Sequence, residues 1–181
     1  MGNPLWAPWR MEYVLSQKRA EGCVFCGVAG ASAEERAARL VVVSAECAFV
    51  VLNRYPFAAG HLLIVPHLHV AGLEDLSTDD HDALFRLVRA SVVRLRAAVK
   101  AEGVNVGLNL GAAAGAGIAE HLHVHVVPRW SGDTNFMPVV ADTRVVPQAL
   151  EATRQHLEGH FADLAAPSVP AAAEPRRGTG S

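Results

Sequence analysis

The feature that most constrains the fold is a short alternating segment that begins at residue 121. It contains three histidines, His121, His123 and His125, and the residues between and after them are apolar. Because successive side chains of a β-strand point to opposite faces, the pattern predicts a strand over 121–127 whose three imidazoles share one surface. Neighbouring rings would start roughly 6.5 Å apart, which suits contacts along a phosphate chain or around a metal ion. One histidine is readily explained as a polar residue on the solvent-facing side of a strand. Three histidines on the same side are poorly explained in this way.

The remaining apolar patterns predict a sheet and two helices. Runs bounded by turn residues predict strands over 40–43, 48–52, 61–65 and 104–110. Ser77 or Thr78 predicts the start of a long helix, which apolar residues at three- and four-residue spacing continue to Lys100, with Gly103 placed to end it. Residues 148–160 predict a short C-terminal helix. The fold class is therefore α+β, with a mainly antiparallel sheet covered on one face by the long helix.

Length and composition indicate one domain. The chain has 181 residues, of which 51% are hydrophobic, enough for one substantial core. We expect an N-terminal aromatic arm over 1–22, a domain over 23–164, and a disordered tail over 165–181 that is rich in Pro, Ala and Gly. No apolar run approaches a membrane span or a signal segment, so we expect a cytoplasmic protein. The net charge is -2, so the chain lacks the excess of Lys and Arg with which proteins bind long nucleic acids.

The loop before the histidine segment is made almost entirely of small residues. It runs from Asn109 to Gly117 and contains three glycines and four alanines. Such a backbone can approach a ligand closely and present N–H groups to anionic oxygens, which points to phosphate. A flexible hairpin connection would have the same composition. Imidazoles beside this loop could act as nucleophiles, proton donors or metal ligands near neutral pH.

A pair of cysteines near the N-terminus suggests a metal site. Cys23 and Cys26 have the two-residue gap that lets both thiolates reach one tetrahedral Zn(II), although they supply only half of its ligands. Free thiols or a redox pair are the alternatives. The third cysteine, Cys47, lies in an apolar run and fits a small core residue.

The histidine segment resembles the histidine-triad superfamily, whose pattern is His-apolar-His-apolar-His followed by two apolar residues. Asn53 and the pair Gly60-His61 lie where that superfamily has a matching upstream segment. Residues 5–13 and 128–137 look like the bacterial branch similar to diadenosine tetraphosphate phosphorylases. The resemblance implies an α+β HIT-like fold and a homodimer whose sheets join.

The resemblance also implies roles for individual residues. His123 would form a covalent nucleotidyl intermediate, which water or phosphate then resolves, while His125 and His61 would orient the nucleophile and the phosphate. Asn53 would contact the ribose, and the loop residues Asn109 and Gly117 would also contact the nucleotide. The walls of a base pocket would be Phe49, Val51 and Leu63. Each of those three apolar residues also fits an ordinary core position.

Two details bear on the metal and on the leaving group. Zinc-bearing relatives complete their site with a histidine after a Val-Pro segment and with the first triad histidine, which implies His69 and His121 here, with His67 as an alternative to His69. Such a closed four-ligand site would be structural. Many triad hydrolases carry Gln or Ser just before the strand, whereas residues 116–120 have neither. Glu120 resembles the phosphorylase-like branch and could act on the leaving group or simply face solvent.

These observations predict an enzyme that cleaves dinucleoside polyphosphates, such as diadenosine tetraphosphate, through a nucleotidyl-histidine, with inorganic phosphate as the acceptor. The alternatives are a nucleoside phosphoramidate or mononucleotide hydrolase of the same superfamily, and a nucleotide- or zinc-binding regulatory module with little turnover.

Overall fold

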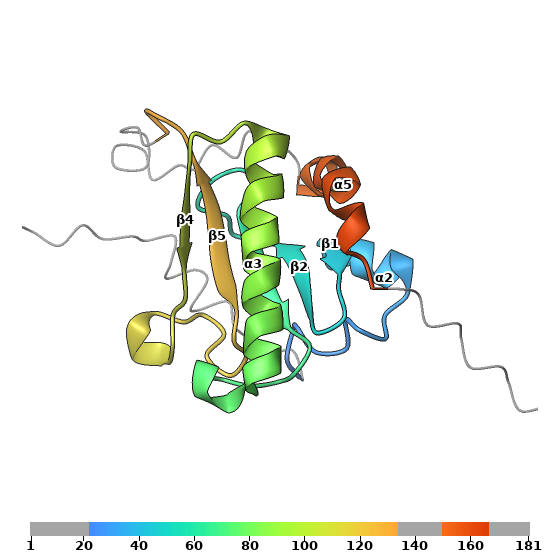
Figure 1. Cartoon of the computed structure of the whole chain (residues 1–181), viewed down its shortest axis with the longest axis vertical. Helices are drawn as coiled ribbons and strands as arrows, with labels where there is room; N and C mark the ends of the chain where they lie inside the picture. The colour runs from blue at the N-terminus through green and yellow to red at the C-terminus, as the bar shows by residue number, and fades with distance from the viewer. Residues whose placement is uncertain (1–21, 134–149, 167–181) are drawn as a thin grey trace, which may run out of the picture.

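A five-stranded antiparallel sheet forms the centre of the molecule, and the long helix α3 lies across one of its faces (Figure 1). The computed structural model describes residues 22–133 and 150–166. The strands are β1 (Val41–Ser44), β2 (Ala48–Leu52), β3 (Leu62–Pro66), β4 (Gly103–Gly107) and β5 (Val124–Arg129), in the order β1-β2-β3-β5-β4. The helices are α2 (Ala33–Ala38), α3 (Thr78–Val99) and α5 (Leu150–Phe161). The α+β class with one long and one short C-terminal helix is thus confirmed.

The sheet has two distinct faces, which the strand register assigns. Val50, Ile64 and Val124 lie opposite one another, are fully buried, and share the face on which α3 packs. A side chain added at Gly60 would meet both Leu95 of α3 and Pro128 of that face, at 3.5 and 3.6 Å. On the other face His125 pairs with Leu63, which pairs with Val51. We call this second surface the histidine face.

Helix α3 begins as predicted but ends earlier. The Ser77 Oγ accepts a hydrogen bond from the Asp80 N–H at 3.1 Å, which caps the first turn. The helix ends at Val99, and Lys100 follows it in a left-handed conformation with φ 52°, so the predicted stop at Gly103 is wrong, and Gly103 instead opens β4. The Trp130 indole donates to the Lys100 carbonyl at 3.1 Å and so satisfies one of the acceptors that the helix end leaves without an intrahelical partner.

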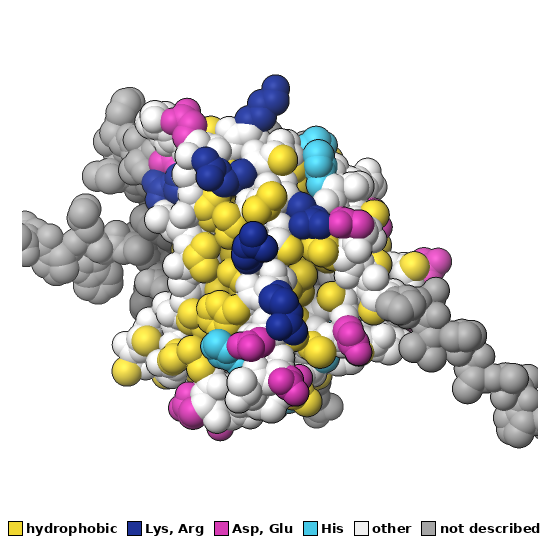
Figure 2. Space-filling model, in the orientation of Figure 1, with side chains coloured by type: hydrophobic (Ala, Val, Ile, Leu, Met, Phe, Trp, Pro, Cys, Tyr) yellow, Lys and Arg dark blue, Asp and Glu magenta, His cyan; other side chains and the backbone are white. Residues whose placement is uncertain are grey.

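The outer side of α3 is solvent-exposed and basic. Arg86, Arg89 and Arg96 of this helix and Lys100 at its C-terminal end are all exposed. Figure 2 shows dark blue Lys and Arg side chains along the outer side of α3. Val93, which is 60% exposed, lies on the same helix. The buried side carries Leu84, Leu87, Val88, Ser91 and Leu95. The helix therefore separates into a core face and a solvent face, as its residue spacing predicts.

The predicted strands differ from the observed ones mainly at their ends. Strand β2 matches, β1 and β3 each start one residue later than predicted, and β4 stops at Gly107 rather than residue 110. Strand β5 starts at Val124, so the predicted strand over 121–127 is wrong for its first three residues. The reason is that the ladder with β3 ends at the Ile64–Val124 pair, and the Leu122 N–H instead donates to the Val70 carbonyl at 2.7 Å.

Several predicted segments fall outside the described residues. They are the arm over 1–22 apart from Gly22, residues 134–137 of the phosphorylase-like segment, and the tail beyond residue 166. The Ala166 N–H donates to the Ser44 carbonyl at the β1 edge at 2.9 Å. Within 22–133 and 150–166, no helix is long and apolar enough to cross a membrane. The homodimer with joined sheets stays a prediction.

Candidate active site and metal cluster

His123 is held as a neutral imidazole with a defined tautomer. It is 7% exposed, and its Nδ1 lies 2.8 Å from the carbonyl oxygen of His121. A carbonyl can only accept, so Nδ1 carries the proton and Nε2 keeps its lone pair. Burial lowers the pKa of His123, and the bond to that carbonyl opposes the shift in part. His123 is therefore prepared to act as a nucleophile through Nε2 near neutral pH.

His61 and His125 form a second unit with the complementary proton arrangement. The backbone N–H of Phe57 donates to His61 Nδ1 at 3.1 Å, so His61 carries its proton on Nε2. That Nε2 lies 3.0 Å from His125 Nδ1 and donates to it. His125 must then carry its own proton on Nε2. The two units thus present a lone pair on His123 and an N–H on His125, on rings whose centroids lie 5.0 Å apart.

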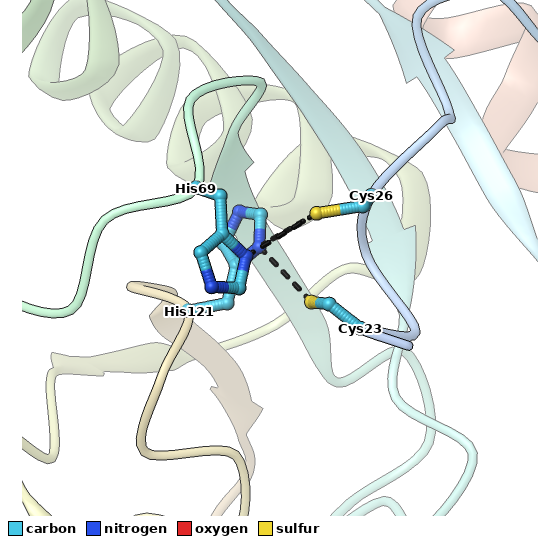
Figure 3. Close-up of side chains that lie close together, drawn as sticks. All are labelled: Cys23, Cys26, His69 and His121. Atoms are coloured by element: carbon cyan, nitrogen blue, oxygen red, sulfur yellow. Dashed lines mark hydrogen bonds between the residues drawn. The ribbon is translucent and has the colours of Figure 1, made fainter. Parts of the chain in front are cut away.

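The cysteine pair and two histidines come together as predicted, in the cluster that Figure 3 shows. The four ligand atoms of Cys23, Cys26, His69 and His121 all lie within 4.8 Å of one another. The sulfur-to-nitrogen distances include 3.2 Å from Cys23 to His121 and 3.2 Å from Cys26 to His69, both to Nδ1. A tetrahedron with the usual Zn–S and Zn–N bonds has edges of roughly 3.3–3.8 Å. The cluster can therefore hold a metal ion.

The surroundings of the cluster prepare its atoms to act as ligands. His121 Nε2 donates to the Pro66 carbonyl at 3.0 Å, which leaves the Nδ1 lone pair directed at the two sulfurs. Burial and the neighbouring Cys23 raise the pKa of the Cys26 thiol, so a thiolate there needs a nearby cation. His67 donates instead to the Ala45 carbonyl at 3.0 Å and stacks on Phe49, so it is not part of the cluster.

Phe25 lies between the cysteine-histidine cluster and His123, a contact that the sequence did not predict. It lies between the two cysteines, is 8% exposed, and its ring centroid is 5.4 Å from that of His121 and 5.5 Å from that of His123. The sequence offered one signal, a large apolar residue between the two cysteines, but the pattern did not indicate whether that residue was buried or exposed. Val24, its neighbour, does face solvent at 57% exposure.

The other predicted nucleotide contacts lie around the histidines in different ways. Asn53 is next to His61, with its amide nitrogen 3.4 Å from His61 Nδ1, and it accepts from the Tyr55 N–H through its side-chain oxygen. Asn109 lines a cavity beside His125. Gly117 and Glu120 are exposed in the loop before the triad.

The three predicted base-pocket residues are on the histidine face but are closely covered. Phe49, Val51 and Leu63 are 1%, 6% and 7% exposed. They belong to the main hydrophobic core of the described residues, together with Phe25 and Val28 from the N-terminal segment. In this structure little of their side-chain surface is open to a base. Their proposed role as base-pocket walls stays a prediction.

Comparison with known proteins agrees with this geometry. A family model described as the HIT domain matches residues 34–132. The chain is 38% identical over 166 residues to the AP-4-A phosphorylase of Mycobacterium tuberculosis, covering 87% of this chain and 84% of that protein. It superposes on a histidine triad nucleotide-binding protein from Sulfolobus tokodaii with a TM-score of 0.63 and 25% identity, covering 78% of this chain and 93% of the other. A Zn-bound histidine triad family protein from Mycobacterium smegmatis gives 0.62 and 26%, with coverages of 79% and 95%. The chain therefore belongs to the HIT domain family.

Proposed function

We propose that the chain is a nucleotidyl transferase that cleaves dinucleoside polyphosphates, with diadenosine tetraphosphate as the representative substrate and inorganic phosphate as the acceptor. The main observation in support of the proposal is that two neighbouring triad histidines have complementary tautomers. His123 offers a lone pair that can attack phosphorus, and His125 offers an N–H that can hydrogen-bond to a phosphate oxygen.

The reaction proceeds in two displacements at one phosphorus. His123 Nε2 forms a bond to the phosphorus next to one nucleoside, and the bond from that phosphorus to the bridging oxygen breaks. The bridging oxygen keeps the electron pair and leaves as part of a nucleoside 5′-triphosphate when the substrate is diadenosine tetraphosphate. A phosphate oxygen then attacks the same phosphorus, forms ADP, and returns the electron pair to His123 Nε2. Water in place of phosphate would yield AMP.

Two further observations support this choice of substrate and acceptor. The relative from M. tuberculosis that shares 38% identity is named for phosphorolysis of AP-4-A, and the alignment covers most of both chains. The loop before the triad lacks the Ser or Gln that many triad hydrolases use, and Glu120 stands there instead. We assign to Glu120 a role near the leaving group, in agreement with its exposed position directly before His121.

For the metal cluster we propose a structural Zn(II) bound by Cys23, Cys26, His69 and His121. Two thiolates and two imidazoles are the ligand set that zinc prefers, and four protein ligands leave no open position for water. Zinc at this site would supply a cross-link between the N-terminal segment and the residues that precede β5. The neighbour from M. smegmatis is itself described as Zn-bound.

The test is product analysis with diadenosine tetraphosphate, with and without inorganic phosphate, resolving ATP, ADP and AMP by chromatography. We expect ADP and ATP in equal amounts, appearing only with phosphate. AMP and ATP without phosphate would make the protein a hydrolase, and no turnover would contradict the proposal and favour a binding module.

The matched variant for the nucleophile is His123→Ala. It should abolish turnover while nucleotide affinity, measured by calorimetry, changes much less, because the rest of the site remains. If affinity and turnover were lost in parallel, the nucleophile assignment would be wrong.

A further inference from the structure

A groove on the histidine face begins at the last triad histidine and leads away from the nucleophile. Its volume is about 330 Å³, and its lining includes His125, Val127 and Arg129 of β5 but not His123. Those β5 residues lie at alternate positions of one strand, so the groove follows β5 for roughly 13 Å. On the neighbouring strand β4, Gly107 pairs with His125 and Asn105 pairs with Val127. Phe57 lines the same groove.

Gly107 is the residue that keeps this groove open beside His125. Its φ is not in the positive range, so the backbone conformation does not require glycine. A Cβ added at Gly107 would meet no heavy atom within 4 Å. Glycine inside a strand weakens the strand and commonly marks a place where a ligand approaches closely. What Gly107 provides here is space, directly across the sheet from a triad histidine.

The groove lining suits a nucleoside better than an additional phosphate. The Phe57 side chain is 55% exposed although its ring stacks on His61 with centroids 4.9 Å apart, so the aromatic surface is held in place and still accessible. Asn105 accepts from the Arg129 guanidinium through Oδ1 at 3.2 Å, which fixes its amide and presents its NH₂ as a donor. The Arg129 charge is balanced by its ion pair with Asp133.

We propose that this groove binds the nucleoside of the departing nucleotide of a dinucleoside polyphosphate, and that Gly107 determines this specificity by admitting it. The inference rests on the proposed function and extends it. In the first displacement the leaving oxygen lies roughly in line with the attacking atom, on the far side of the phosphorus from His123. The groove satisfies that geometry because it starts at His125 and excludes His123.

The test compares two substrates that differ only in the second nucleoside, diadenosine tetraphosphate and adenosine 5′-tetraphosphate. We expect the wild-type protein to have a kcat/KM at least tenfold higher for diadenosine tetraphosphate. Gly107→Val should remove most of that preference, and Gly107→Ala should give an intermediate ratio. The matched control is Val104→Ile, which adds bulk on the same strand β4 but on the α3 face, where Val104 pairs with Pro128 and does not line the groove. It should leave the ratio unchanged.

The outcomes separate the groove assignment from the proposed function. If the wild type cleaves both substrates equally well, or if Gly107→Val keeps the full preference, the groove does not bind the second nucleoside. The same holds if Gly107→Ala, Gly107→Val and Val104→Ile all change the ratio alike. Melting temperature and size-exclusion elution of each variant show whether folding or assembly has changed instead. A wild type that cleaves neither substrate would overturn the proposed function, and the groove assignment with it.

Discussion

Replacing Cys26 by serine tests the metal cluster with little disturbance of the surrounding fold. The substitution removes a sulfur that lies 3.2 Å from His69 Nδ1 and 3.8 Å from His121 Nδ1. The main-chain hydrogen bonds of this residue, from its N–H to the Cys23 carbonyl and from Arg39 to its own carbonyl, do not involve the side chain. Cys47→Ser is the matched control, because Cys47 is also partly buried but lies outside the cluster.

The expected effect on stability follows from binding linkage. A zinc ion that binds only the folded chain, at a free concentration 100 times its Kd, stabilises that state by about 2.7 kcal/mol. For a domain of roughly this size, each kcal/mol changes Tm by about 4 °C. Loss of zinc from Cys26→Ser should therefore lower Tm by about 10 °C in zinc-containing buffer.

Two measurements check this prediction on the purified full chain. Elemental analysis should find one zinc per chain in the wild type and in Cys47→Ser, and much less in Cys26→Ser. Calorimetric scans with and without a chelator should show a large metal-dependent shift for the first two proteins and almost none for Cys26→Ser. Equal zinc contents in the three proteins, or a wild-type Tm that does not respond to the chelator, would refute a four-ligand zinc site.

Three further predictions concern the histidine relay, the core and a surface ion pair. His61→Ala removes the donor to His125 Nδ1, so kcat should fall about 100-fold with a smaller change in KM; an unchanged kcat in steady-state assays would contradict the relay. Leu95→Ala, at a fully buried position, should lower the free energy of unfolding in urea by about 2–5 kcal/mol; a loss below about 1 kcal/mol would contradict tight packing there. Arg94 lowers the pKa of Asp163, so Asp163→Asn should slightly lower Tm at pH 7, and the difference should vanish as the pH falls below about 4; a difference that persists in acid would refute the pairing.

The sequence predicted the architecture because that information is local. Strand and helix periods, the Ser77 cap and the apolar runs act over a few residues, and the observed sheet and helices agree with them apart from their ends. The ends of the helices and strands, in contrast, depend on hydrogen bonds with residues that are distant in the sequence. Strand β5 starts at Val124 because the Leu122 N–H bonds to Val70, and α3 ends before Gly103, where Trp130 satisfies the Lys100 carbonyl.

The candidate site divides in the same way. The alternating histidines and the Cys-x-x-Cys spacing identified side chains that the structure brings together in the candidate site, because these patterns reflect strand and metal-ligand geometry. Which imidazole offers a lone pair and which offers a proton was decided by the carbonyl of His121 and the N–H of Phe57. Such tautomers depend on backbone groups whose positions are fixed only when the chain is folded.

The sequence by itself thus determined which residue types are available, on which strand, and at what spacing. Tertiary structure alone decided what those residues can do together. It brought Cys23 and Cys26 to within bonding reach of His121, nearly one hundred residues away, and placed Phe25 against His123. It also placed Gly107 opposite His125, where the absence of a side chain leaves open space. The physical reason is that strand register and side-chain packing bring together atoms that no local pattern relates.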